Sequence, residues 1–218
     1  MKQNWLCKSC GCQFIENPKK RGLDDRDKEL VGNMLNERIS IRGIARVLNV
    51  SRNCLRKYIK TVGAQAPEPE ETLNKDEIDF EHDDVEIDVI WTYIGRRKKE
   101  HYIYIFVAIH RKSRQVLAFQ VGRRDVDTIA LLWEKLKLLG VNGPVHTDEL
   151  RAFYKVIPKS QHVDDGKRGG TSVVEGLNTR WRARCSRLVR RSVSCSKFLS
   201  PLVTAFKIAV GTWNLSLQ

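Results

Sequence analysis

The spacing of hydrophobic residues divides the chain into a helical first part and a second part that begins with strands. Between Leu23 and Lys60 the apolar residues recur at helical spacing, whereas from Val85 onward they alternate with polar residues or form continuous runs. The segment Ala64–Glu71 has two prolines and no apolar periodicity, which is typical of a linker. The pattern therefore predicts a small all-α unit joined to a larger mixed unit.

Three short helices are predicted in the first part. Asp24 or Asp25 can cap the first, Ser40 the second and Ser51 the third. A tight turn at Asn49–Ser51 separates the last two, as in a helix-turn-helix whose third helix enters the major groove. The exposed face of that helix would carry side chains suited to bases and phosphates, namely Arg52, Asn53, Arg56, Lys57 and Lys60. A plain three-helix module with a solvated basic face is the alternative.

The mixed part opens with a strand-like run that contains a carboxylate. Alternation over Val85–Ile94 places Val85, Ile87, Val89, Trp91 and Tyr93 on one face and Glu86, Asp88, Ile90, Thr92 and Ile94 on the other. A charge within such a run is costly unless it is paired. Asp88 is therefore either a solvated carboxylate on a half-exposed strand or a rigidly held metal ligand.

Two further apolar runs follow the first strand, at residues 101–109 and 115–121, and short turns join all three into an antiparallel meander. Asp127 or Thr128 then caps a helix that Gly140 closes. A crossover through this helix should lay the next strand parallel to an earlier one.

That fourth strand is Pro144–Thr147, and Asp148 stands at its carboxyl end. If the neighbouring strand is the first one, Asp88 and Asp148 face each other at an edge where open sheets bind ligands. Asp148 could instead simply cap a helix over Glu149–Tyr154.

A third carboxylate opens a long helical pattern that starts at Ser172, after a glycine-rich loop. Glu175 lies in the first turn, where the helix dipole favours a negative charge, and capping is its simplest role. Seven basic residues and no acidic one follow between Asn178 and Lys197. A carboxylate beside an arginine-rich helix also suits a metal ion next to phosphate.

Charge is distributed unevenly along the chain of 218 residues, whose net charge is +13. Eleven acidic residues and one lysine lie between Ala66 and Asp88, so the remainder holds 38 basic and 15 acidic residues. Such a division favours binding to a polyanion, most commonly nucleic acid, over a generically basic protein. No run is long enough for a membrane span and no signal core is found, so we expect a cytoplasmic, nucleoid-associated protein.

Cysteines gather near the beginning of the sequence. Cys7 and Cys10 have the spacing of half a zinc knuckle, but structural zinc takes four ligands and Cys12 is the only nearby addition. Free thiols are the alternative to a zinc site completed by further ligands.

At these residues the sequence resembles the transposases of the insertion sequence one family. The similarity runs through Glu86–Asp88 with Trp91–Gly95, Thr147–Asp148 with Tyr154, Glu175 with Asn178 and Arg187–Leu188, and the basic-serine run Arg190–Lys197. The Cys pair and the helix-turn-helix resemble the family's end-binding module. The family's knuckle has two Cys pairs and this chain shows one, a difference that an upstream start or a truncation would explain.

The resemblance implies a ribonuclease H-like domain in which Asp88, Asp148 and Glu175 form a DDE triad that binds Mg²⁺, two ions about 4 Å apart. Water would first free a 3′-hydroxyl at the element's end, and that hydroxyl would then attack target DNA. It also implies a homo-oligomer acting on terminal inverted repeats. Arginines after the glutamate would neutralise phosphates, namely Arg180, Arg184, Arg187, Arg190 and Arg191.

The sequence thus predicts an α/β protein, a ribonuclease H-like mixed sheet flanked by helices and preceded by a helix-turn-helix with a partial zinc knuckle. The predicted units are a Cys knuckle (1–22), a helix-turn-helix module (23–63), an acidic linker (64–84) and a catalytic domain (85–218). A defective copy that represses the element and a nuclease of the same fold are the alternatives to an active transposase.

Overall fold

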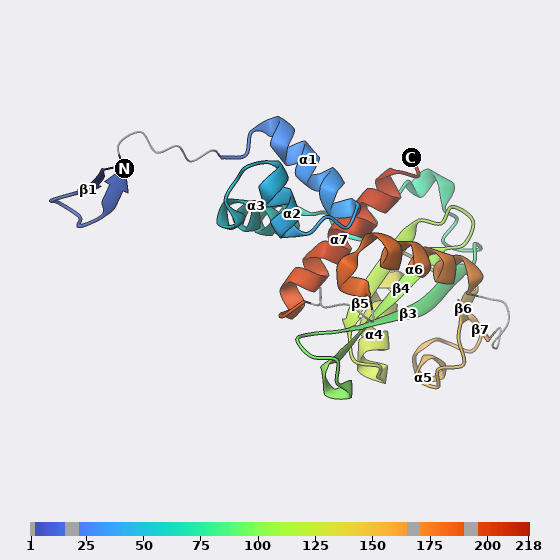
Figure 1. Cartoon of the computed structure of the whole chain (residues 1–218). Coiled ribbons are helices and arrows are strands. Elements are labelled where there is room, and N and C mark those ends of the chain that lie inside the picture. Colours follow the sequence, from blue (N-terminus) through green and yellow to red (C-terminus); the bar gives the residue numbers. More distant parts are fainter. Residues whose placement is uncertain (1–2, 16–21, 165–170, 190–195) are drawn as a thin grey trace.

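The computed structural model describes residues 3–15, 22–164, 171–189 and 196–218 (Figure 1). Its first element is a hairpin of β1 (Asn4–Leu6) and β2 (Gln13–Ile15), paired antiparallel. In the described part of the chain no helix is both long and apolar enough to cross a lipid bilayer.

Three helices follow the hairpin, α1 (Asp25–Asn36), α2 (Ile41–Val47) and α3 (Arg52–Gln65). The predicted caps are present, since Asp24, Ser40 and Ser51 each accept a backbone N–H at the start of their helix. Asn49 has a φ of 52°, the left-handed conformation that reverses the chain between α2 and α3. The helices share a small core of Val31, Ile44, Ala45, Leu48, Val50 and Leu55.

The second part of the chain is built on a five-stranded mixed sheet. Its strands are β3 (Val85–Tyr93), β4 (Tyr102–His110), β5 (Val116–Gly122), β6 (Val145–Thr147) and β7 (His162–Asp164), in the order β5-β4-β3-β6-β7. The first three form the predicted antiparallel meander, and β6 lies parallel to β3. The prediction that the fourth strand lies parallel to an earlier one is confirmed, and the structure shows that this neighbour is the first strand of the sheet.

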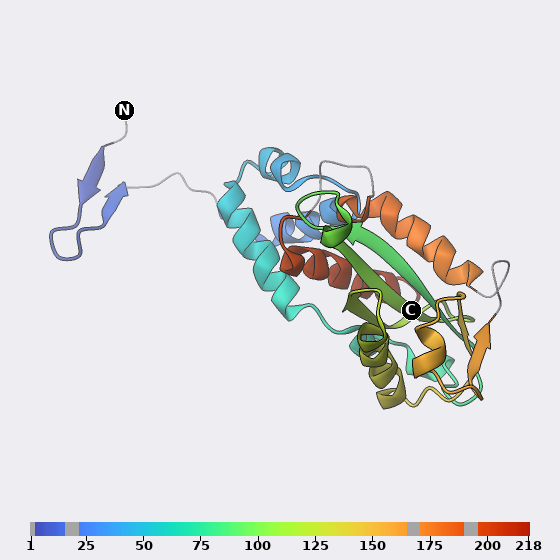
Figure 2. The same cartoon turned by 90° about the horizontal axis from the view of Figure 1, so that it is seen from below.

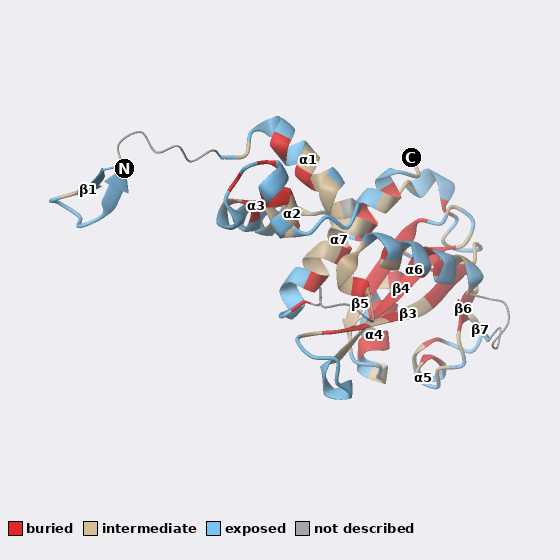
Figure 3. Ribbon diagram, in the orientation of Figure 1, coloured by how far each residue is buried: buried red, intermediate tan, exposed pale blue. Residues whose placement is uncertain are grey.

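Helices cover both faces of this sheet (Figures 1 and 2). α4 (Val126–Leu138) and α5 (Phe153–Val156) pack on the face that contains Ile87, and α6 (Ser172–Arg184) and α7 (Leu199–Leu215) pack on the face that contains Ile90. Both faces of β3 are consequently buried, as the central strands of Figure 3 show. Of the two alternatives for this strand, the half-exposed one is wrong. The mixed α/β architecture is consistent with a ribonuclease H-like fold.

The predicted cap of α4 and the capping alternative for Asp148 are also wrong. Asp125, rather than Asp127 or Thr128, caps α4, because its Oδ1 accepts the N–H of Thr128 at 3.0 Å. Asp148 caps no helix: its Oδ1 accepts the N–H of Leu150 at 3.1 Å in a local turn. The helix predicted over Glu149–Tyr154 forms later, as α5.

The acidic segment 64–84 is partly packed, although most of its acidic side chains are exposed. It forms two short 3₁₀ helices, η1 (Pro69–Thr72) and η2 (Lys75–Glu77), and η1 packs against β5 and α7. Asn214 of α7 is fully buried at this junction, where it bonds Val116 on β5 and Thr72 on η1. This packing ties the segment to the sheet.

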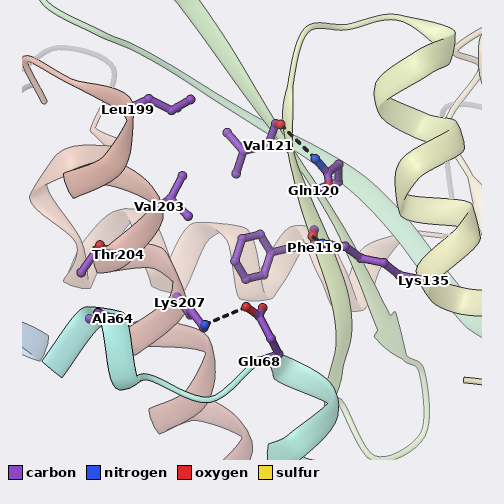
Figure 4. A pocket seen from close by; sticks show the side chains of 11 residues that line it. Ala64, Glu68, Phe119, Gln120, Val121, Lys135, Leu199, Val203, Thr204 and Lys207 are labelled. Atoms are coloured by element: carbon purple, nitrogen blue, oxygen red, sulfur yellow. Dashed lines mark hydrogen bonds and ion pairs between the residues drawn. The ribbon is translucent and has the colours of Figure 1, made fainter. Parts of the chain in front are cut away.

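The end of α3 also packs against α7. Gly63 makes this contact close, because a Cβ at that position would lie 2.0 Å from Cγ2 of Thr204. A pocket lies beside the contact, lined by α3, β5 and α7, and an ion pair of 2.7 Å between Lys207 and Glu68 spans its side (Figure 4).

Candidate active site

Three elements bring the predicted carboxylates into one region. Asp88 lies in the middle of β3, Asp148 follows the last residue of β6, and Glu175 lies in the first turn of α6. The register pairs Glu86 with His146, so Asp88 and Asp148 each stand two residues further along adjacent parallel strands. The sheet therefore places these two carboxylates side by side, as the sequence predicted.

Burial and the neighbouring carboxylates both affect the pKa of Asp88. Burial raises the pKa of its carboxyl group, and the charges of Asp148 and Glu175 raise it further. Hydrogen bonds from the Val89 backbone and the Asn178 side chain act in the opposite direction. Asp88 is thus a carboxylate under repulsion from two others, which a bound cation would relieve.

Each carboxylate has its own partner in this structure. Asn178 donates from Nδ2 to Oδ2 of Asp88 at 2.7 Å, Arg124 Nη2 lies 3.6 Å from Oδ2 of Asp148, and Thr171 donates to Oε1 of Glu175 at 3.4 Å. Within the described residues, no group of three or more His, Cys, Asp or Glu side chains is arranged to hold a metal ion. The carboxylates are neighbours that point to different partners.

The donor set nevertheless fits a divalent cation such as Mg²⁺. Asn178 is 4% exposed, and among the described residues its Oδ1 has no hydrogen-bond partner. An unsatisfied buried amide oxygen is costly, and hard cations take carboxylate and amide oxygens as ligands. Asp88, Asp148, Glu175 and Asn178 together would supply such ligands.

A hydrogen-bonded chain next to Asp148 was not predicted from the sequence. Thr147 donates to the carbonyl oxygen of Asp148 at 3.0 Å, and Nε2 of His162 lies 2.7 Å from the same hydroxyl. Tyr154 donates to Asp164 beside this chain and its ring contacts that of His162. No sequence pattern pairs these residues, since β7 was not expected.

The predicted phosphate-binding arginines differ in their surroundings. Arg180 and Arg184 are exposed on α6, and the Arg180 guanidinium lies 4.9 Å from the centre of the Trp213 ring. Arg187 is half-buried and donates to the hydroxyl of Ser196 at 2.7 Å. Arg190 and Arg191 lie outside the described residues. All five predicted contacts of α3 are exposed, namely Arg52, Asn53, Arg56, Lys57 and Lys60.

The cysteine pair lies in the turn between β1 and β2. The Ser9 hydroxyl lies 3.0 Å from Cys7 Sγ, and this hydrogen bond is the largest of the effects that lower the Cys7 pKa to about 6. Hydrogen bonds involving Cys10 act in the same direction. A low thiol pKa favours the thiolate that zinc requires, although the described residues place no third ligand with Cys7 and Cys10.

The pocket of Figure 4 contains none of the predicted site residues among its lining. The carboxylate region is therefore distinct from this pocket, and lies along the adjacent strands β3 and β6 beside α6.

Comparison with known proteins identifies the family. The model of the IS1 transposase family matches residues 84–211, which include every strand of the large sheet, α6 and most of α7. No match was found among curated proteins. Because the family match spans more than half of the chain, this protein belongs to the IS1 transposase family.

Proposed function

We propose that the chain is a DDE-type DNA transposase that binds the ends of an insertion element and catalyses Mg²⁺-dependent strand cleavage and strand transfer. One geometric observation carries this proposal: the register of β3 with β6 sets Asp88 and Asp148 at equivalent positions on adjacent strands, and Asn178 ties the helix that contains Glu175 to Asp88. Membership of the family supplies the reaction class.

The three carboxylates would hold Mg²⁺, and the free Oδ1 of Asn178 is oriented by the same hydrogen bond that fixes Asp88. When bound, the metal activates the attacking oxygen and stabilises the leaving one. The exposed Arg180 and Arg184 on the same helix as Glu175 would neutralise the DNA backbone beside the site. Phosphate contacts of this kind position the strand and make binding sensitive to salt.

Recognition of the element end is assigned to the α2–α3 pair as a helix-turn-helix. The support is the left-handed Asn49 at the turn, the shared apolar core and the five exposed polar and basic side chains on α3. The packing of Gly63 against Thr204 keeps α3 attached to α7 of the catalytic part. The domain boundaries, a homo-oligomer on DNA, nucleoid association and zinc at Cys7 and Cys10 stay predictions.

The proposal is tested with three single variants, Asp88→Asn, Asp148→Asn and Glu175→Gln, on a DNA duplex that carries the element's terminal inverted repeat. Each should reduce Mg²⁺-dependent cleavage by about 10³-fold or more, because metal stabilisation of the transition state supplies several kcal/mol. Binding of the duplex should be retained.

Asp76→Asn is the matched control, since Asp76 is an exposed carboxylate of the acidic segment. It should cleave like the wild type. Undiminished cleavage by any triad variant would remove that residue from the site. A wild type that binds the repeat but cleaves nothing would favour a repressor, and cleavage without strand transfer would favour a nuclease.

A further inference from the structure

Glu86 is a fully buried carboxylate two residues before Asp88 on the same face of β3. Burying a charged group costs several kcal/mol unless hydrogen bonds and an opposite charge compensate it. The contacts of Glu86 therefore indicate what holds it inside the protein.

One oxygen of Glu86 caps helix α6 from the strand that the helix packs on. Its Oε2 accepts the backbone N–H groups of Val173 at 3.0 Å and Val174 at 2.9 Å. These are first-turn donors that have no partner within the helix, and they form the positive end of its dipole. In the described part of the chain, the N-cap residue Thr171 makes no side-chain cap. Glu86 thus supplies the negative end group that the helix lacks locally.

The other oxygen of Glu86 forms an ion pair with Arg111, whose Nε lies 2.8 Å from Oε1, although among the described residues this oxygen accepts no hydrogen bond of good geometry. Arg111 follows β4 and is itself held by Asp84, through its backbone N–H at 2.9 Å and Nη1 at 3.3 Å. Nε2 of His146, on β6, lies 3.5 Å from the same Asp84 carboxylate. The cap is therefore anchored to three strands of the sheet.

A second contact fixes the next turn of α6 to the same strand, since Asn178 donates to Asp88 at 2.7 Å. Glu175 lies between the two fixed points, directly after Val174. Two contacts one turn apart determine both the height and the rotation of a helix along a strand. We propose that Glu86, held by Arg111, is a positioning residue that directs Glu175 toward Asp88 and Asp148. This rests on the proposed function of Glu175 as a metal ligand.

If Glu86 only stabilised the fold, an apolar side chain could replace it. A well-packed apolar side chain often replaces a buried ion pair with little loss of stability, but it cannot accept N–H groups. The identity of Glu86 should therefore affect the α6 N-terminus more than it affects the overall fold.

The experiment compares Glu86→Gln and Glu86→Leu with the wild type by hydrogen exchange, Mn²⁺ binding and cleavage of the element end. Glu86→Gln keeps the shape and one acceptor oxygen, so it serves if Glu86→Leu fails to fold. Glu81→Gln is the matched control, because Glu81 is an exposed glutamate shortly before β3. Circular dichroism and the melting temperature establish that each variant is folded.

We expect exchange at the amides of Val173 and Val174 to become at least about 10-fold faster in Glu86→Leu and less so in Glu86→Gln, because an amide oxygen is the weaker acceptor. The Mn²⁺ dissociation constant and the Mg²⁺ concentration for half-maximal cleavage should rise about 10- to 100-fold, the usual effect of losing a residue that orients a ligand. Glu81→Gln should change none of them.

Unchanged exchange at both amides in folded Glu86→Leu would overturn the proposal, and so would faster exchange with unaltered Mn²⁺ affinity. Cleavage by the wild type and its loss in Glu175→Gln decide the proposed function separately. Exchange and Mn²⁺ binding decide the positioning role even for a chain that cuts no DNA.

Discussion

Asn178 donates its Nδ2 hydrogen to Oδ2 of Asp88 over 2.7 Å, and so joins the second turn of α6 to the middle of the central strand. The bond orients the carboxylate and leaves the buried Oδ1 of Asn178 without a described partner. Asn178 is therefore part of the proposed metal site, a role that was not assigned to it from the sequence.

Replacing Asn178 by alanine should weaken metal binding without removing any carboxylate. We expect the Mg²⁺ concentration for half-maximal cleavage to rise about 10- to 100-fold, because residues that orient ligands have effects of this size. The measurement is cleavage of the element end over a Mg²⁺ titration. Asn142→Ala is the control, since exposed Asn142 bonds only Glu81 among the described side chains. Equal titrations for both variants would assign Asn178 to packing alone.

Asp88→Asn should make the folded protein more stable at neutral pH in the absence of metal. Burial raises the pKa of Asp88, so between the ordinary carboxyl pKa and the raised value the folded chain binds more protons than the unfolded chain. The contribution of Asp88 to stability therefore falls as the pH rises through that window, and stays low above it.

The measurement for Asp88 is the melting temperature as a function of pH. At pH 7 the variant should melt a few degrees above the wild type, and the difference should shrink as the pH falls through the window. Added Mg²⁺ should raise the melting temperature of the wild type only, since a ligand stabilises the state that binds it. A variant that melts below the wild type at pH 7 without metal would contradict this account.

The double change Arg52→Ala and Arg56→Ala on α3 should relax the preference for element ends. Arginine contacts to base edges are worth about 1–3 kcal/mol of discrimination each, so affinity for the terminal repeat should fall while affinity for unrelated duplex changes less. Fluorescence anisotropy on both duplexes at one fixed salt concentration measures this. Arg26→Ala is the control, because Arg26 is exposed on α1. If the double variant lost the same affinity for both duplexes, the α3 arginines would contact phosphates and not base edges.

The strands and helix starts that follow local rules could be predicted from the sequence. Alternation over Val85–Ile94 assigned the two faces of β3 correctly, and the caps at Asp24, Ser40 and Ser51 follow from side chains that bond their own helix. The crossover rule then predicted that β6 lies parallel to an earlier strand, and the structure identifies that strand as β3. These features depend on a few neighbouring residues.

The features that could not be predicted depend on residues far apart in the chain. α7 is apolar over much of its surface and shows little helical periodicity, because it is buried against the sheet and α6. Glu86 accepts hydrogen bonds from Val173 and Val174, which lie 87 and 88 positions later in the sequence. Asn178 and Asp88, which also form a hydrogen bond, are 90 positions apart. Such partners become visible when topology brings the elements together.

Asn214 and the acidic segment together cover the outer edge of strand β5. The side-chain amide of Asn214 accepts from the N–H of Val116 at 2.8 Å and donates to the carbonyl of Val116 at 3.0 Å, on β5 at the end of the sheet order. One side chain thereby makes the pair of bonds that an additional strand would make, and η1 covers the same edge. Open strand edges are templates for self-association. A catalytic half expressed from residue 85 would keep Asn214 but lose η1, which would uncover part of the β5 edge and favour self-association, whereas a fragment that begins before Pro69 keeps both.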